Sequence, residues 1–151
     1  MAKSGVYTYT FTVPEAAIDF NGHVGNVTYL QWMVEAATRH SASRGWSMEK
    51  CLKAGGTWVA KKHCIEYLRP AFAGQRLRMR TWLESIEKIR AVRRYEILDD
   101  ESGTLLAKGE SEWIFVDAER FRPMRIPEKI VASFVEGGGE EHDGDEGRQS
   151  K

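Results

Sequence analysis

The chain has 151 residues, of which 42% are hydrophobic and 29% charged, values typical of a single globular domain with one core. No apolar run approaches the roughly 18 residues of a membrane-spanning helix, and the first residues form no apolar signal segment, so we expect neither. Two cysteines, Cys51 and Cys64, do not make a disulfide framework or a four-ligand zinc site. We therefore expect a reducing, cytoplasmic location.

The zero formal net charge hides an uneven distribution along the chain. Residues 136–151 carry six acids, two bases and five of the 14 glycines, which leaves 20 bases and 16 acids in residues 1–135. Because the tail has no apolar residue, ordering it would bury nothing that offsets the entropy cost. We predict one domain over residues 1–135 and an acidic, glycine-rich, disordered tail over residues 136–151. The net charge of +4 on the body is too weak to indicate nucleic-acid binding.

The expected elements begin with a strand and a long helix. Residues 6–13 alternate threonine with aromatic or β-branched residues, which predicts a half-buried strand ended by Pro14. After a polar loop, a helix extends to about Arg44 and ends before Gly45. Because apolar side chains cover most of its circumference, this helix is expected to be buried inside a sheet.

The rest of the body has a β texture. The pattern predicts a short helix over 48–54, strands over 57–69, 75–85, 88–98 and 104–117, and a last helix over 127–134. Consecutive strands joined by short turns are antiparallel. The fold class is therefore α+β, with an antiparallel sheet wrapped around one long buried helix. The exposed edges of such a sheet favour assembly into a dimer or a larger oligomer.

The loop before the long helix, residues 19–26 (DFNGHVGN), is where we expect chemistry. Gly22 and Gly25 permit positive φ or close approach of a ligand, and Asn26 is a candidate N-cap. Unpaired N–H groups in the first helical turn polarise a carbonyl and stabilise the oxyanion that forms when it is attacked. A carboxylate at Asp19 would attack that carbonyl or deprotonate a water, so the loop supplies both halves of acyl transfer.

The same residues have plainer interpretations. Asp-x-x-Gly is also an ordinary turn in which the aspartate binds its own backbone. His23 alone is more typical of a structural hydrogen bond than of a general base. Tyr29 and Glu35 on the helix are more typical of core packing and of an exposed or paired carboxylate than of catalysis.

Two motifs carry a resemblance to a known family. Residues 19–30 (DFNGHVGNVTYL), with Glu35 following, resemble hotdog-fold acyl-CoA thioesterases of the hydroxybenzoyl-CoA thioesterase type, whose pattern is roughly Asp-x-x-Gly-His-Val-Asn-Asn-x-x-Tyr-Leu. Residues 66–71 (EYLRPA) resemble the family's Tyr-x-Arg-Pro-Ala turn, and the resemblance spans about residues 5–134. It implies a hotdog fold, hydrolysis of an acyl-CoA to acid and CoA, and a sheet-to-sheet homodimer, commonly paired into a tetramer, with active sites at subunit interfaces.

The resemblance also implies roles for individual residues. Asp19 is then the catalytic carboxylate, as nucleophile or general base, and the N–H at Asn26 polarises the thioester carbonyl. Three further residues shape the loop around that carbonyl: Gly22, His23 and Val24. Gly25 departs from the family pattern by replacing the first of two asparagines, which leaves the local hydrogen bonding and loop rigidity open.

Candidate substrate-binding residues are Tyr29, Lys88 and Arg90. The two basic residues best match family positions that bind the phosphates of CoA, for which the forked donor of arginine is suited. A two-residue turn at 86–87 would also place Arg80 opposite Arg93, and like charges so opposed need an anion or a carboxylate between them. In the alternative interpretation the face is simply solvated, and its bases pair with Glu96, Glu110 and Glu112.

The expected partner is an acyl-CoA substrate, with acyl-carrier-protein thioesters left open and with no nucleic acid or membrane. We expect no metal and no cofactor, since CoA is part of the substrate. One alternative function is a hotdog enoyl-CoA hydratase, although residues 19–23 fall one position short of its Asp-x-Asn-x-x-His motif. The other is a non-catalytic protein that binds acyl-CoA or an acyl carrier protein.

Overall fold

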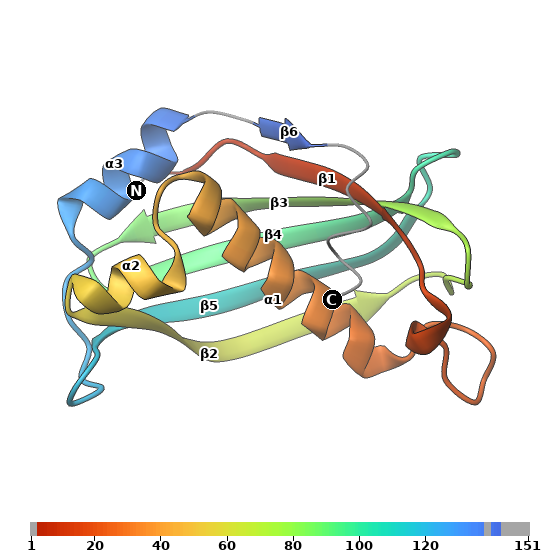
Figure 1. Ribbon diagram of the computed structural model, residues 1–151, viewed down its shortest axis with the longest axis horizontal. Helices are drawn as coiled ribbons and strands as arrows, with labels where there is room; N and C mark the ends of the chain where they lie inside the picture. Colours follow the sequence, from red (N-terminus) through yellow and green to blue (C-terminus); the bar gives the residue numbers. More distant parts are fainter. Residues whose placement is uncertain (1–2, 138–139, 143–151) are drawn as a thin grey trace.

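One antiparallel sheet and a long helix organise the computed structural model, which describes residues 3–137 and 140–142 (Figure 1). The elements are β1 (Tyr7–Thr12), the short 3-10 helix η1 (Glu15–Ala17), α1 (Asn26–Ser43), α2 (Met48–Lys53), β2 (Gly56–Tyr67), β3 (Arg76–Glu87), β4 (Arg90–Asp99), β5 (Leu105–Asp117), α3 (Glu128–Gly137) and β6 (Glu140–His142). The strand order is β2-β5-β4-β3-β1-β6, and every pairing except β1–β6 is antiparallel. The predicted α+β class is confirmed.

Strand β3 shows how the sequence gives the sheet one buried face. Its side chains alternate along most of the strand between the core and the outer surface. Leu77, Met79 and Leu83 are buried, whereas Arg78 and Arg80 lie on the opposite face. Because successive side chains of a strand point to opposite faces, this alternation sets which side of the sheet packs on α1.

Helix α1 buries one stripe rather than most of its circumference. The buried residues Tyr29, Met33, Ala36 and His40 recur every three or four positions and face the sheet. A glycine on β5 allows the close approach, since a Cβ at Gly109 would lie only 2.8 Å from the sulfur of Met33. One sheet covers one side of a helix, so apolar residues elsewhere on α1 stay accessible, and Val27 is 70% exposed.

The hairpin between β3 and β4 differs from the predicted register. Its two-residue turn lies at residues 88–89, because Glu87 pairs with Arg90 and a bulge between Leu83 and Ser85 shifts the pairing. The predicted like-charge pair is therefore wrong. Arg80 lies opposite Glu96, and Arg93 lies opposite Leu83 with its side chain in the core.

The end of the chain adds a helix and a strand. Helix α3 continues to Gly137, and β6 pairs in parallel with the edge strand β1. Both enter the stretch 136–151 for which the sequence predicts disorder. For β6 the reason is that main-chain pairing at an open strand edge needs no apolar side chain. The remainder of that prediction, at 138–139 and 143–151, lies outside the described residues. Within the described ranges, no helix is both long enough and apolar enough to cross a membrane.

Candidate active site

Main-chain hydrogen bonds hold the loop of residues 19–25 against the start of α1. The Asp19 N–H donates to the His23 carbonyl at 2.9 Å, and the Gly22 N–H donates to the Asp19 carbonyl at 3.0 Å. Gly22 has a φ of 84°, a conformation that glycine adopts without strain. The Val24 N–H donates to the Ala71 carbonyl at 2.9 Å, which ties the loop to the motif at residues 66–71.

The Asp19 carboxylate lies beside the first turn of α1. Its Oδ1 accepts a hydrogen bond from the Asn21 N–H at 2.8 Å, which is the geometry of an aspartate turn. Its Oδ2 lies against Gly25, where a Cβ would be only 3.4 Å away. No salt bridge among the described residues engages this carboxylate. The turn therefore holds one oxygen and leaves the other without an ionic partner.

Helix α1 begins with unpaired amides next to this carboxylate. Gly25, not Asn26, is the N-cap, so the prediction of an asparagine cap is wrong by one residue. Gly25 has an extended backbone and no side chain, and its carbonyl accepts the Thr28 N–H at 3.1 Å. The N–H groups of Asn26 and Val27 have no hydrogen-bond partner in the described part of the chain. First-turn amides carry the positive end of the helix dipole, so they can hold a carbonyl oxygen or an oxyanion.

Exposed apolar side chains surround the loop. Phe20 is 96% exposed, and Val27 and Phe72 are also exposed. The His23 ring meets Phe72 edge-on at 6.4 Å, and its Nδ1 lies 3.2 Å from the Val24 carbonyl. The Tyr67 hydroxyl donates to the Asn26 carbonyl at 3.1 Å. An apolar rim of this kind around a polar loop is typical of a surface that meets another molecule.

The helical candidates Tyr29 and Glu35 follow their plainer interpretations. Tyr29 is buried in the core, edge-on to Trp32 and Tyr67, and burial raises the pKa of its hydroxyl. Glu35 forms an ion pair with Arg39 at 3.0 Å, one turn further along α1. The structure therefore places the tyrosine in the packing under the loop and the glutamate in a surface pair.

The basic residues of the β3–β4 hairpin lie mostly in ion pairs. Arg90 pairs with Glu112, and this contact lowers the pKa of that carboxyl. Arg94 pairs with Glu110 at 3.2 Å. Lys88 is exposed at the hairpin tip with a φ of 56° and takes part in none of the salt bridges found among the described residues. Arg90 and Arg94 therefore match the alternative interpretation, in which this face is solvated and its bases pair with glutamates. The ammonium of Lys88 forms no salt bridge with a described residue and could contact a ligand.

The predicted catalytic loop and the predicted CoA-binding residues lie at opposite ends of the molecule (Figure 1). The loop is tied to Ala71, just before β3, whereas Lys88 directly follows β3. A strand of 12 residues spans roughly 40 Å. Within one chain, therefore, the structure does not bring Lys88 and Arg90 to Asp19.

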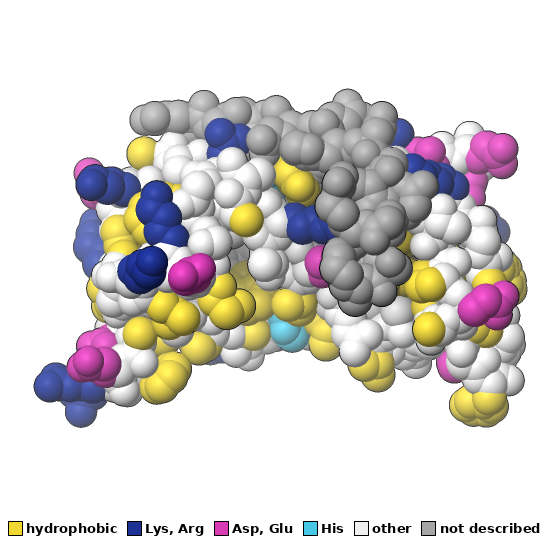
Figure 2. Space-filling view, in the orientation of Figure 1, with side chains coloured by type: hydrophobic (Ala, Val, Ile, Leu, Met, Phe, Trp, Pro, Cys, Tyr) yellow, Lys and Arg dark blue, Asp and Glu magenta, His cyan; other side chains and the backbone are white. Residues whose placement is uncertain are grey.

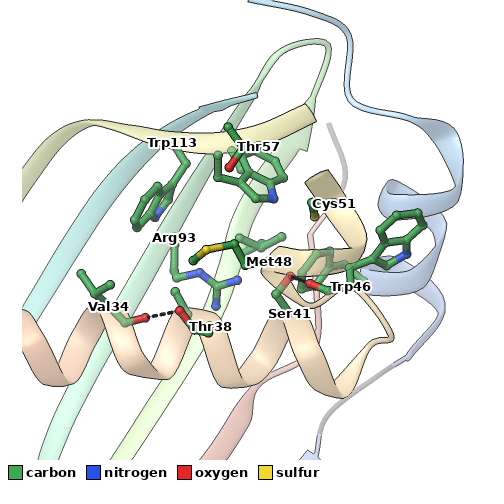
Figure 3. A pocket seen from close by; sticks show the side chains of 14 residues that line it. Val34, Thr38, Ser41, Trp46, Met48, Cys51, Thr57, Arg93 and Trp113 are labelled. Carbon is green, nitrogen blue, oxygen red and sulfur yellow. Dashed lines mark hydrogen bonds between the residues drawn. The ribbon is translucent and has the colours of Figure 1, made fainter. Parts of the chain in front are cut away.

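A cavity of about 170 Å³ lies at the hairpin end, between the second half of α1, α2 and the sheet (Figure 3). Its walls are mainly apolar and aromatic and include Val34, Trp46, Trp58, Leu83, Trp113 and Phe134. Figure 2 shows hydrophobic side chains gathered around α2, on the same side of the molecule. Nothing in the sequence pattern predicts this cavity, because its lining residues come from seven helices and strands, and periodicity alone does not determine how these elements pack.

Arg93, which lines the cavity, forms a buried polar pair with His40. Arg93 Nη1 lies 3.0 Å from His40 Nδ1 and donates to the Thr81 hydroxyl at 3.0 Å. Burial, reinforced by the Arg93 and Arg44 charges, lowers the pKa of His40 to about 2, so its ring is neutral and accepts from the guanidinium. Among residues 3–137 and 140–142, no three His, Cys, Asp or Glu side chains are grouped so as to hold a metal ion.

Comparisons with known proteins identify the family and the fold. Residues 4–134 match the family described as acyl-ACP thioesterase N-terminal domain. The chain is 27% identical, over 116 residues, to a protein named acyl-CoA thioester hydrolase YbgC from Escherichia coli O6:H1, and the alignment covers 77% of this chain and 86% of that one.

Two solved structures are similar in fold. One is the crystal structure of Slr0204, a 1,4-dihydroxy-2-naphthoyl-CoA thioesterase from Synechocystis, with a TM-score of 0.80, 23% identity, and coverage of 86% of this chain and 96% of that one. The other is SAV2348 from Staphylococcus aureus in complex with CoA, with a TM-score of 0.82, 20% identity, and coverage of 88% and 84%. The predicted hotdog fold is confirmed by these likenesses.

Proposed function

The chain belongs to the acyl-ACP thioesterase N-terminal domain family, and from this premise we propose that it hydrolyses an acyl-CoA thioester with Asp19 as the reacting carboxylate. Its expected class, thioester hydrolase, is confirmed by the family match and by the relative named for that activity. The residue-level proposal is carried by one observation: the Asp19 carboxylate lies against Gly25, directly before the unpaired amides of Asn26 and Val27.

The proposed reaction uses both groups at once. The thioester carbonyl oxygen accepts hydrogen bonds from the amides of Asn26 and Val27, which stabilise the negative charge that develops on it. Asp19 either attacks the carbonyl carbon, giving an anhydride that water then hydrolyses, or takes a proton from the water that attacks. In both cases the carbon–sulfur bond breaks, the thiolate of CoA leaves and takes up a proton, and the acid is released.

The remaining loop residues support this geometry. The turn at Gly22 keeps Asp19 in place through the carbonyl that its N–H binds. His23 and Val24 close the loop, since the Val24 amide anchors it to Ala71. A bulky side chain at position 25 would press on the carboxylate, so glycine at that position leaves Asp19 room beside the helix start.

We place the complete site between two copies of the chain. One copy offers an exposed apolar rim around Asp19, which includes Phe20 and Val27, and it offers β2 as an unpaired, largely exposed sheet edge. The other copy would supply the cavity for the acyl group and the Lys88–Arg90 hairpin for the phosphates of CoA. A second copy is proposed because one chain keeps Asp19 and the Lys88–Arg90 hairpin at opposite ends of β3, which spans roughly 40 Å.

A thiol-release screen tests the function. Aryl, short-chain and long-chain CoA esters are compared with the same acyl groups on acyl carrier protein, and release of the thiol from at least one series is expected. Formation of 3-hydroxyacyl-CoA from an enoyl-CoA without thiol release would instead support the hydratase. Tight binding of acyl-CoA without turnover would support a binding protein.

A further inference from the structure

Arg93 is a buried cation without a buried anion. It is 3% exposed, in the middle of β4. Its hydrogen-bond partners among the described residues, Thr81 and His40, are both neutral. The acids on the neighbouring strand positions serve the opposite face of the sheet, where Glu96 pairs with Arg80 and Glu110 pairs with Arg94. No salt bridge among the described residues neutralises the Arg93 guanidinium.

Burial of an unpaired charge destabilises the folded state of a protein. Burial lowers the pKa of Arg93 only to about 10, so the guanidinium stays protonated at neutral pH. An uncompensated buried charge destabilises the folded state, whereas an apolar side chain of similar volume would pack at this position without that penalty. The hydrogen bonds to Thr81 and His40 engage only Nη1, which leaves Nε and Nη2 without a hydrogen-bond partner among the described residues.

A second donor lacks a partner in the same cavity. The indole Nε1 of Trp113 is buried and has no hydrogen-bond acceptor among the described residues, and the side chains of Trp113 and Arg93 both belong to the cavity wall. Figure 3 shows the guanidinium directed into the space between the sheet and α1. The hydroxyls on the α1 wall are already engaged, since Thr38 donates to the Val34 carbonyl and Ser41 donates to the Trp46 carbonyl. The unused nitrogen groups here are N–H donors, which require an oxygen acceptor, and the Thr57 hydroxyl, which also lines the cavity, can donate or accept.

The size and walls of the cavity describe the rest of the ligand. A cavity of about 150 Å³ accommodates a benzene ring, and this one measures about 170 Å³. Three tryptophans and Phe134 line it, which suits a flat ring better than a flexible chain. A ligand with an aromatic ring and one anionic oxygen at its inner end would pack against the aromatic walls and accept hydrogen bonds from the nitrogen donors.

We propose that the cavity selects a ring-sized acyl group whose end remote from the thioester carries a carboxylate or a similar anionic oxygen, bound by Arg93 and Trp113. The identity of the ligand as an acyl group rests on the proposed thioesterase function. The recognition of the anion rests on the two donors alone, so the two ideas can fail separately.

Matched esters test the selectivity. 4-Carboxybenzoyl-CoA and 4-isopropylbenzoyl-CoA have nearly the same shape, and they differ in charge at the far end. Wild-type protein should hydrolyse the carboxylate ester with a kcat/KM at least tenfold higher. Arg93→Met should lower kcat/KM for that ester by roughly ten- to a hundredfold, because a charge-assisted bond is lost, and should leave the isopropyl ester unaffected or faster. Arg94→Met, the same change one residue along on the opposite face, is the control and should keep the preference.

Binding of benzoate provides a readout that does not depend on turnover. Benzoate is titrated into the protein and followed by the fluorescence of the tryptophans that line the cavity and by calorimetry. Wild-type protein should bind it, Arg93→Met should lose roughly ten- to a hundredfold in affinity, and Trp113→Phe should lose severalfold. If circular dichroism shows that Arg93→Met does not fold, Arg93→Lys and Trp113→Phe are used instead, and each should show an intermediate loss of benzoate affinity.

The outcomes separate the two ideas. Arg93-dependent binding of benzoate without thiol release from any ester would overturn the thioesterase function and keep the anion site. Thiol release with no preference between the two esters, together with benzoate binding that Arg93 and Trp113 do not affect, would overturn the anion site and keep the function.

Discussion

The two ends of α1 are built in opposite ways. At its N-terminal end an exposed loop presents main-chain amides and one carboxylate, and most of the hydrogen bonds that hold the loop join backbone groups. At its C-terminal half, aromatic side chains enclose a cavity, and the polar groups Arg93 and His40 are buried. The structure of the first end depends on the conformation of the backbone, whereas the structure of the second end depends on which side chains line the cavity.

From this contrast we expect the loop to govern the chemistry and the cavity to govern substrate selectivity. Changes in the Asp19 loop should alter the rate of reaction with little effect on folding, because few buried contacts depend on that carboxylate. Changes around His40 and Arg93 should alter stability or substrate choice, because these side chains join α1 to β3 and β4 in the core. The predictions below test the two ends in turn.

Asp19→Asn should have the largest effect. If Asp19 handles the proton or attacks the carbonyl, kcat for thioester hydrolysis should fall by roughly 10²–10⁴. Asparagine keeps the Oδ1 that accepts from the Asn21 N–H, so the melting temperature should stay near that of wild type. The measurements are thiol release and thermal denaturation.

The matched control is Asp117→Asn. Asp117 also accepts a main-chain hydrogen bond in a turn, from the Glu119 N–H at 2.8 Å, and it lies far from the loop at the end of β5. Its variant should keep wild-type turnover. Wild-type turnover in the Asp19 variant would remove that carboxylate from the mechanism.

His40→Asn should flatten the pH dependence of stability. His40 is 1% exposed, and its folded-state pKa of about 2 lies below the ordinary value of 6.5. Below about pH 6.5 the unfolded chain binds a proton that the folded chain does not, so the free energy of unfolding falls by up to about 1.4 kcal/mol per pH unit as the pH drops. The variant should lose this slope.

Urea denaturation at pH 7, 6 and 5 measures the slope. The carboxyls with lowered pKa, such as Glu84 and Asp99, titrate below this range and do not interfere. The half-buried His63, whose pKa burial also lowers, is present in both proteins and cancels in the comparison. Parallel curves for wild type and variant would show that His40 does not set the pH dependence.

Arg90→Ala should have a smaller and more selective effect. If the hairpin binds CoA phosphates, KM for CoA esters should rise by roughly three- to tenfold, about the loss of one solvent-exposed charge contact. KM for pantetheine esters, which lack the nucleotide, should stay constant. Arg94→Ala, on the same face and also paired with a glutamate, is the control. Equal changes for both kinds of ester would remove Arg90 from the CoA site.

The features that follow from local rules were predictable from the sequence. The alternation along residues 76–83 gave the buried face of β3, and the motif at residues 19–30 located the loop and the helix start. The resemblance of residues 19–30 and 66–71 to the hotdog family predicted the fold. In the structure the two motifs are in contact, since the Val24 amide donates to the Ala71 carbonyl.

The features that depend on register were not predictable. A bulge at residues 83–85 decides which of the adjacent Arg93 and Arg94 points into the core, and a shift of one residue reverses the answer. The cavity depends on that choice and on how α2 packs. Strand β6 forms by pairing with the open edge of β1, and no side-chain pattern in the sequence predicts this pairing.

Mixed oligomers test the central claim that the two ends of α1 act together between two copies of the chain. Asp19→Asn removes the carboxylate, and Ala37→Trp fills the cavity from α1. Hetero-oligomers of the two variants, isolated with two different tags, should recover about half of the wild-type rate of thiol release, since one of two symmetric sites is then intact. Hetero-oligomers as inactive as either variant alone would contradict the claim and place the whole site within one chain.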